Sequence, residues 1–173
     1  MESSEGFLEA VSGILFRCNS DEGSGQLATS PAKTALLTVS FKECELDGHR
    51  CTTSGQPKGA VLTNVLEATF VEEGPLVLVL LKPSTGTAWF TNTNCGFEEF
   101  ELEGSLLGTL TPQSTKTKTL TATFKQTSGM QEQHEVEGNE DVLMSDWGGS
   151  IEQAGLTSTE TLTLEGGEGT LEP

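Results

Sequence analysis

Apolar and polar residues alternate with a period of two along several segments of the chain. In Thr115 to Lys125 (TKTKTLTATFK), five threonines fall on one face, and Leu120 and Phe124 fall on the other. Lys33 to Lys42 (KTALLTVSFK) and Thr157 to Leu164 (TSTETLTL) alternate in the same way. Successive side chains of a strand point to opposite faces, so this pattern predicts half-buried strands. We expect Leu120 and Phe124 in the core and the threonine row in solvent.

A second pattern, an unbroken apolar run, occupies Pro75 to Leu81 (PLVLVLL) and fits a central strand that is covered on both faces. Further strand candidates are Gly13 to Arg17, Gly59 to Thr63, Leu66 to Val71, Ala88 to Thr91 and Phe97 to Glu103. Segments rich in Gly, Pro and Asp separate them and predict turns, for example Asp21 to Gly25. About ten strands predict an all-β protein, an antiparallel β-sandwich or barrel with at most one short helix.

The helix candidate is Asn139 to Ala154, where Leu143, Trp147 and Ile151 recur every four residues. The pair Gly148-Gly149 interrupts it, so a strand and turn stay open there. The length fits a single β domain over residues 1–164, with two packed β subdomains meeting near 104–115 as the alternative. We expect residues 165–173 to form a frayed C-terminal tail.

The formal net charge is −17, and no Lys or Arg follows Lys125. Such a chain repels nucleic acid phosphates and anionic membrane surfaces. No apolar run approaches the ~20 residues of a membrane span, and Met1 to Glu5 lacks the basic start of a signal peptide. We therefore expect no nucleic acid partner and no membrane insertion. The remaining partners are a cation, another protein, or a second copy that pairs through edge strands.

Four cysteines form two disulfides in the simplest interpretation, which places the chain in an oxidising compartment, extracellular or in the cell envelope. Asp47-Gly48 is a strong hairpin signal between Cys44 and Cys51. The sequence therefore favours a Cys44–Cys51 disulfide, with Cys18–Cys95 as a long-range link. The alternative is a zinc site made of three thiolates and one imidazole, namely Cys44, His49, Cys51 and Cys95. Its spacing matches no common zinc motif.

Other chemistry finds little support in the sequence. There is no Gly-x-Ser-x-Gly motif and there are two histidines, so we expect no catalytic residue, no cofactor and no enzymatic activity. Acidic clusters offer weak calcium candidates, Asp21, Glu22, Asp141 and Asp146. Trp89 and Trp147 are candidate ligand contacts, because indoles stack on sugars and apolar molecules.

The blocks Phe16-Arg-Cys18, Thr38 to Thr53 (TVSFKECELDGHRCTT) and Thr63-Asn-Val-Leu66, followed by the single Cys95, carry a family resemblance. They are similar to exported actinobacterial four-cysteine β-proteins to which no function is assigned. In these proteins a (V/I)-x-F-x-x-C…C-(T/S) block precedes T-N-x-L and a later cysteine. The resemblance covers roughly residues 14–164. It implies export and β structure, and it carries over no catalytic residue.

The sequence therefore predicts an extracellular or cell-envelope β module with a structural or binding role. One alternative is a β-barrel that binds a small apolar molecule or a glycan, with a tryptophan in its pocket. Another is a secreted hydrolase that uses carboxylates such as Glu98, Glu99 and Glu101.

Overall fold

The chain folds into antiparallel β-sheet, and the part that the structure describes contains no helix. The computed structural model describes residues 2–3, 6–27, 33–96, 98–113, 116–136, 138–165 and 168–169. The predicted all-β class is confirmed, and between sandwich and barrel the structure is a barrel with extra strands.

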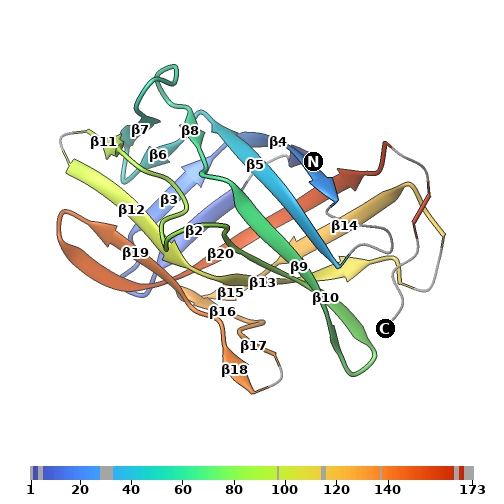
Figure 1. Cartoon of the computed structure of the whole chain (residues 1–173). Coiled ribbons are helices and arrows are strands. Elements are labelled where there is room, and N and C mark those ends of the chain that lie inside the picture. Colours follow the sequence, from blue (N-terminus) through green and yellow to red (C-terminus); the bar gives the residue numbers. More distant parts are fainter. Residues whose placement is uncertain are drawn as a thin grey trace.

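Eight strands close one ring, in which each strand is hydrogen-bonded to the next and the last returns to the first (Figure 1). In ring order they are β1 (Glu2–Ser3), β4 (Ser20–Leu27), β5 (Thr34–Lys42), β9 (Leu66–Glu73), β10 (Leu76–Pro83), β13 (Leu106–Thr111), β14 (Thr119–Phe124) and β20 (Ser150–Thr163). Closure of a sheet removes the unpaired edges that favour aggregation.

A second ring of eight strands shares β20 with the first ring and forms the other end of the barrel. Its members are β2 (Gly6–Ala10), β3 (Leu15–Cys18), β6 (Glu45–Leu46), β7 (His49–Thr53), β11 (Thr93–Cys95), β12 (Glu98–Gly104), β19 (Leu143–Trp147) and β20. The chain passes almost directly from one ring to the other at β1–β2, β3–β4, β5–β6 and β12–β13. The two rings are therefore the two ends of one eight-stranded barrel. The short β8 (Val61–Leu62) adds to β5.

Side chains fill the barrel and form one large buried cluster. In the second ring, three phenylalanines pack together: Phe16 stacks on Phe100 with ring centroids 5.1 Å apart, and Phe90 lies tilted against Phe100 with centroids 5.6 Å apart. In the first ring, β14 contributes Leu120 and Phe124, which are 6% and 3% exposed. The alternation of β14 thus has its apolar face inward, as the sequence predicts.

The apolar run in β10 is buried on both faces, which confirms its prediction. Val77 and Val79 face the barrel core, whereas Leu78 lies in a second, outer cluster. Two side hairpins lie between β14 and β19 in the chain: β15 (Gln126–Thr127) with β16 (Met130–Gln131), and β17 (Glu135–Val136) with β18 (Asn139–Glu140). Val136 of the second side hairpin packs against Leu78 and Leu107 on the outer face, whereas the first side hairpin lies against β20 beside Gly155. The second side hairpin therefore shields an apolar strip on the outside of the barrel.

The side hairpins leave the barrel at the gap between β14 and β19, which pair with different parts of β20. Along β20, the pairing with β19 ends at Ala154, and the pairing with β14 begins at Ser158. Between them the backbone N–H of Leu156 donates to Oε1 of Gln131 at 2.8 Å. One side chain thus satisfies a backbone donor that neither strand reaches.

We expect Val136→Ala to lower the free energy of unfolding by about 1–2 kcal/mol, because it removes buried apolar surface from the outer cluster. Val11→Ala is the matched control, since Val11 is 48% exposed and its loss should cost less than about 0.5 kcal/mol. Urea denaturation of both variants measures the difference. Equal effects would mean that the packing of Val136 on the outer face contributes nothing to the stability of the barrel.

The disulfides join Cys18 to Cys44 and Cys51 to Cys95, so the predicted pairing is wrong although all four cysteines are bonded. The cysteines form one row: Cys18 in β3, Cys44 directly before β6, Cys51 in β7 and Cys95 in β11. Glu45 lies opposite both Arg17 and Arg50, which places Cys44 between Cys18 and Cys51, and Cys51 pairs in turn with Cys95. Both bonded pairs have Cα atoms 4.1 Å apart.

The geometry of this row explains the error. Cys44 and Cys51 do lie opposite each other, with the N–H of Cys51 donating to the carbonyl of Cys44 at 3.0 Å. A bond between them, however, would leave Cys18 and Cys95 three strand spacings apart, about 14 Å. That distance is about twice the largest Cα separation a disulfide spans. The Asp47-Gly48 signal correctly predicts the hairpin of β6 and β7, but it cannot show which strand lies on the other side of each cysteine.

Four further expectations from the sequence can be compared with the structure. Residues 139–154 form strands and a turn, with Gly148 and Gly149 at positive φ between β19 and β20, and not a helix. The turn predicted for Asp21 to Gly25 is wrong, because the segment lies in β4 and pairs along its length with β5. The strand predicted for Ala88 to Thr91 is reduced to one bridge at Ala88. Most of the predicted frayed tail, 165–173, lies outside the described residues.

Candidate functional site

Two carboxyl groups face each other inside the first ring of the barrel. Asp21 points inward from β4 beside Phe41, its partner on β5, and Glu160 points inward from β20 beside Ala122, its partner on β14. They are 5% and 4% exposed. The Ser158 hydroxyl, also buried, donates to Oε1 of Glu160. Oε2 of Glu160 has no hydrogen-bond partner among the described residues.

The barrel interior changes the proton affinity of this site. Burial, and then the charge of Asp21 and a hydrogen bond between the two carboxyls, raise the pKa of Glu160 from 4.5 to about 7, against the opposing effects of Ser158 and of the chain's amino terminus. A hydrogen bond between two carboxyls requires a proton on one of them. The site therefore holds a proton near neutral pH, where an exposed glutamate holds none.

Eight threonines form a regular array on the outside of β13, β14 and β20. Their cross-strand partners are in register: Thr109 with Thr123 and Thr123 with Thr159 in one row, and Thr111 with Thr121 and Thr121 with Thr161 in the next. Thr119 and Thr163 complete a third row. We call this surface the threonine face; its members are Thr109, Thr111, Thr119, Thr121, Thr123, Thr159, Thr161 and Thr163.

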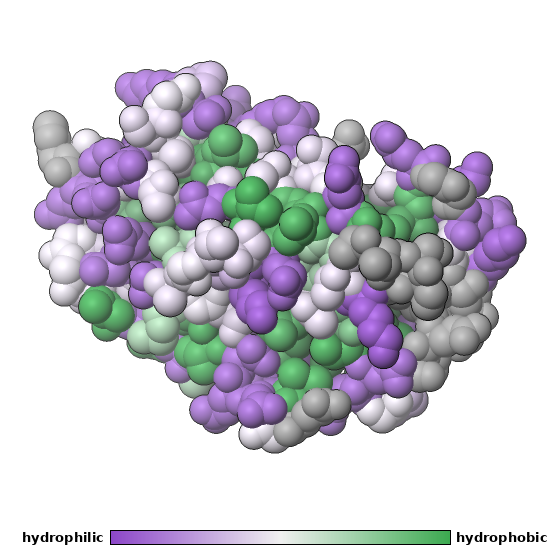
Figure 2. Space-filling view, in the orientation of Figure 1, coloured by the Kyte–Doolittle hydropathy of each residue, from purple (hydrophilic) through white to green (hydrophobic). Residues whose placement is uncertain are grey.

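The threonine face is ordered, partly exposed and uncharged. Five of its members are exposed, and Thr109, Thr121 and Thr123 are half-buried. Neighbours repeat about every 4.8 Å across the strands and about every 6.8 Å along them. β14 lies four strands from β5 in either direction around the ring, so this face is on the opposite side of the barrel from β5 (Figure 1). On the side shown in Figure 2, polar residues break the apolar areas into small pieces.

The sequence predicted two of the three strands that build this face. The Thr-rich alternation of Thr115 to Lys125 and of Thr157 to Leu164 predicted outward threonines on two strands, and both strands are present. That the two strands are neighbours in register could not be read from the sequence. Thr109 and Thr111 were missed, because β13 (LLGTLT) has a glycine and inward leucines that hide the alternation. Thr115 itself lies outside the described residues.

The two tryptophans lie in the second ring or next to it, away from the threonine face. Trp89 is 4% exposed, and its indole N–H donates to the carbonyl of Gly104 at 2.9 Å. Trp147 is half-buried against the core, on β19 opposite Phe100. Ligand contact through either indole stays a prediction.

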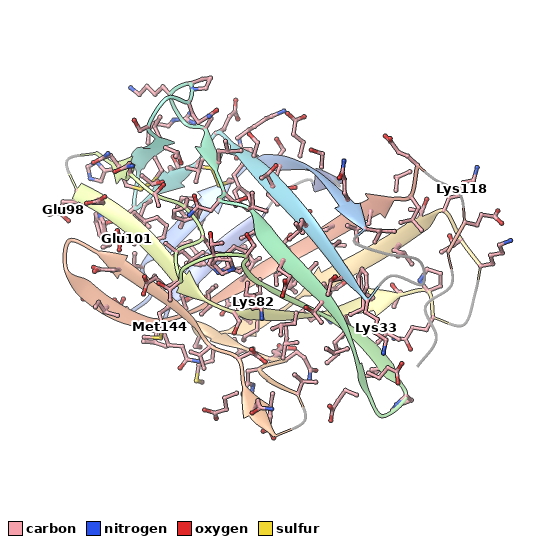
Figure 3. The ribbon with its side chains drawn as sticks, in the orientation of Figure 1. Lys33, Lys82, Glu98, Glu101, Lys118 and Met144 are labelled. Carbon is pink, nitrogen blue, oxygen red and sulfur yellow. A yellow bond between two sulfur atoms is a disulfide. The ribbon has the colours of Figure 1, made fainter. Side chains whose placement is uncertain are left out.

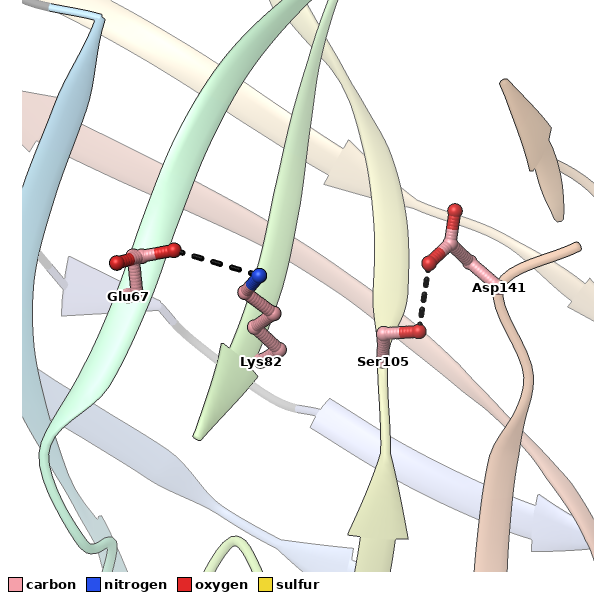
Figure 4. A network of polar contacts seen from close by, with 4 residues as sticks. All are labelled: Glu67, Lys82, Ser105 and Asp141. Atoms are coloured by element: carbon pink, nitrogen blue, oxygen red, sulfur yellow. Dashed lines mark hydrogen bonds and ion pairs between the residues drawn. The ribbon is translucent and has the colours of Figure 1, made fainter. Parts of the chain in front are cut away.

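The four calcium candidates do not form one site in the structure. Asp21 is inside the barrel, whereas Glu22 is outside and forms a salt bridge with Lys42 at 2.9 Å. Asp141 accepts a hydrogen bond from the Ser105 hydroxyl at 2.7 Å, near the Glu67–Lys82 pair (Figure 4). Asp146 accepts one from the N–H of Gly149 at 2.9 Å. Within the described ranges, no three His, Cys, Asp or Glu side chains gather in an arrangement that suits a metal ion.

Glu98 and Glu101 of β12 lie at one end of the barrel and Lys118, just before β14, at the other (Figure 3). Glu98 and Glu99 are exposed, and Glu101 is half-buried.

An open depression of about 380 Å³ lies on the outside of β2 and β3, lined by Phe7, Glu9, Leu15 and Arg17. The described residues include no helix that could span a membrane.

Comparison of the chain with protein-family models, with curated proteins and with solved structures finds no match.

Proposed function

We propose that this chain is an extracellular or cell-envelope module with a structural and binding role, and that it binds through the threonine face. The observation that carries the proposal is the array itself: eight outward threonines on three neighbouring strands, in register and without a charge, on a chain of net charge −17. The two disulfides are consistent with an oxidising compartment.

The chemistry of the face selects its partner. Each threonine offers a hydroxyl that donates and accepts, beside a methyl group. Its β-branched side chain is already restricted by the strand and loses little freedom on contact. A partner without charge meets no electrostatic repulsion there, in contrast to nucleic acid or an anionic membrane. We propose a flat, uncharged, hydroxyl-bearing surface, the glycan of a cell envelope, as the binding partner.

Co-sedimentation of the purified protein with an insoluble uncharged envelope glycan tests this function. Thr121→Lys places a long charged side chain at the centre of the face and should weaken binding at least about tenfold, which corresponds to about 1.4 kcal/mol. Thr38→Lys is the matched control, because Thr38 is a half-buried threonine of β5 on the other side of the barrel. The control should bind within about twofold of the parent protein.

Two results would contradict the proposal. One is that the parent protein stays in the supernatant at every glycan concentration. The other is that Thr38→Lys weakens sedimentation as much as Thr121→Lys, which would show a response to added charge and not to the threonine face.

A further inference from the structure

The open depression on the outside of β2 and β3 has a lining of mixed chemistry. Its four described lining residues form two cross-strand pairs: Phe7 of β2 lies opposite Arg17 of β3, and Glu9 lies opposite Leu15. The residues between them in each strand are buried in the core, so these four side chains point outward. The carboxylate and the guanidinium therefore occupy one diagonal of the depression, and the two apolar side chains occupy the other.

The Glu9 carboxylate is held in place by the first side hairpin. Its Oε2 accepts a hydrogen bond from Nε2 of Gln126 at 2.8 Å. The hairpin comes this close because Gly155, the partner of Glu9 on β20, has no side chain: a Cβ atom there would lie 2.5 Å from the Cβ of Gln126. Among the described residues no hydrogen bond reaches Oε1 of Glu9, so the carboxylate keeps an oxygen that can accept from a ligand.

The Arg17 side chain is exposed and has a carboxylate on either side of it. Glu45 is its cross-strand partner on β6, and Glu9 lies on the diagonal, a separation of about 7–8 Å between strand positions. Neither forms a salt bridge with Arg17, and no other carboxylate in the described ranges does. The guanidinium is thus available to a carboxylate from outside, which it can bind through two parallel hydrogen bonds.

The other diagonal supplies apolar contact. Phe7 and Leu15 are half-buried, so each presents part of its side chain to the depression. The volume of about 380 Å³ lies near the lower end of the range for ligand sites, which is about 300–1,000 Å³. The depression therefore suits a small molecule that has an apolar group beside its charges.

We propose that this depression binds a small zwitterion with an apolar side group, the chemistry of a free apolar α-amino acid. The carboxylate of the ligand pairs with Arg17, its ammonium group pairs with Glu9, and its apolar group packs on Phe7 and Leu15. Each ligand charge meets an opposite charge, and the complex gains no net charge on a chain that already carries −17. This site goes beyond binding at the threonine face and does not depend on it.

Titration of the isotope-labelled protein with L-phenylalanine at neutral pH, followed by the NMR chemical shifts of backbone amides, tests the site. Amides of residues 7–9 and 15–17 should shift and saturate with a dissociation constant on the order of 1 mM, as expected for a ligand of this size in an open site. Amides of Thr109 and Thr121 on the threonine face should not shift, and they serve as the internal control.

Two arginine variants assign the carboxylate contact. Arg17→Gln should weaken the binding of L-phenylalanine at least about tenfold, because it removes the cation that pairs with the ligand carboxylate. Arg50→Gln is the matched control: Arg50 is also exposed and also lies opposite Glu45, but on β7, outside the depression. The control should bind within about twofold of the parent protein.

Two analogues and one further variant assign the ammonium contact. N-acetyl-L-phenylalanine lacks the ammonium group and 2-phenylethylamine lacks the carboxylate, so each should bind the parent protein at least about fivefold more weakly than L-phenylalanine. Glu9→Gln keeps an oxygen that accepts from Gln126 but removes the negative charge. This variant should bind L-phenylalanine and N-acetyl-L-phenylalanine equally well.

The proposal is overturned if L-phenylalanine causes no saturable shifts at residues 7–9 and 15–17 up to about 20 mM, a concentration well above the expected dissociation constant. This titration needs no variant, so it decides the question even if a variant fails to fold. Equal weakening in Arg17→Gln and Arg50→Gln, or equal binding of L-phenylalanine and its N-acetyl derivative by the parent protein, would also overturn it.

Discussion

Replacement of Cys51 and Cys95 by alanine is expected to lower the free energy of unfolding by about 4 kcal/mol. The disulfide closes a segment of 44 residues, and in the loop-entropy model a link of that length restricts the unfolded chain by this amount. Domains of this size have about 5–15 kcal/mol of stability in total, so the loss is a large fraction of it. Urea denaturation without reductant, compared with the parent protein, provides the measurement.

The other disulfide supplies the matched control. Cys18 and Cys44 are 26 residues apart, and their joint replacement by alanine should cost about 3.5 kcal/mol, slightly less than loss of the longer link. A decisive third variant replaces Cys44 and Cys51. It should leave Cys18 and Cys95 as free thiols, and formation of a Cys18–Cys95 disulfide there would contradict the order of strands around the second ring.

Phe124→Ala has the second large effect, an expected loss of at least about 3 kcal/mol. The Phe124 ring is 3% exposed and covers the inward side of Gly108 on β13, where any side chain atom would overlap the ring. Its removal therefore empties a site beside Gly108, which has no side chain to fill the space. Chemical denaturation against the parent protein measures the loss.

Thr119→Ser tests the other face of the same strand. Thr119 is exposed on the threonine face, so the change should alter stability by no more than a few tenths of a kcal/mol. A threonine change more damaging than Phe124→Ala would mean that β14 has the opposite face in the core.

Elements with a strong local pattern were predictable from sequence. β14 and β5 alternate, and β10 is apolar throughout, so their faces follow from period-two geometry alone. β4 was not predictable, because SDEGSGQL has the composition of a turn. Its structure comes from β5, which pairs with it at eight positions, and this outweighs local preference.

The candidate sites show the same limit. Asp21 stood out in the sequence only as a weak calcium candidate in a supposed turn, and Glu160 did not stand out from the polar face of its strand. They are 139 residues apart, and the barrel closure at β1 brings them together. The sequence likewise shows two Thr-rich strands but not that they are neighbours. In both cases the missing information is strand order, which depends on long-range pairing.

The proposed export of this disulfide-bonded barrel is tested most directly by the redox state and location of the protein in the cells that produce it. Cell fractionation, alkylation of free thiols and non-reducing peptide mapping give both at once. We predict protein outside the cytoplasm with Cys18–Cys44 and Cys51–Cys95 links and no alkylated cysteine. Protein found in the cytoplasm with four alkylated thiols would contradict it.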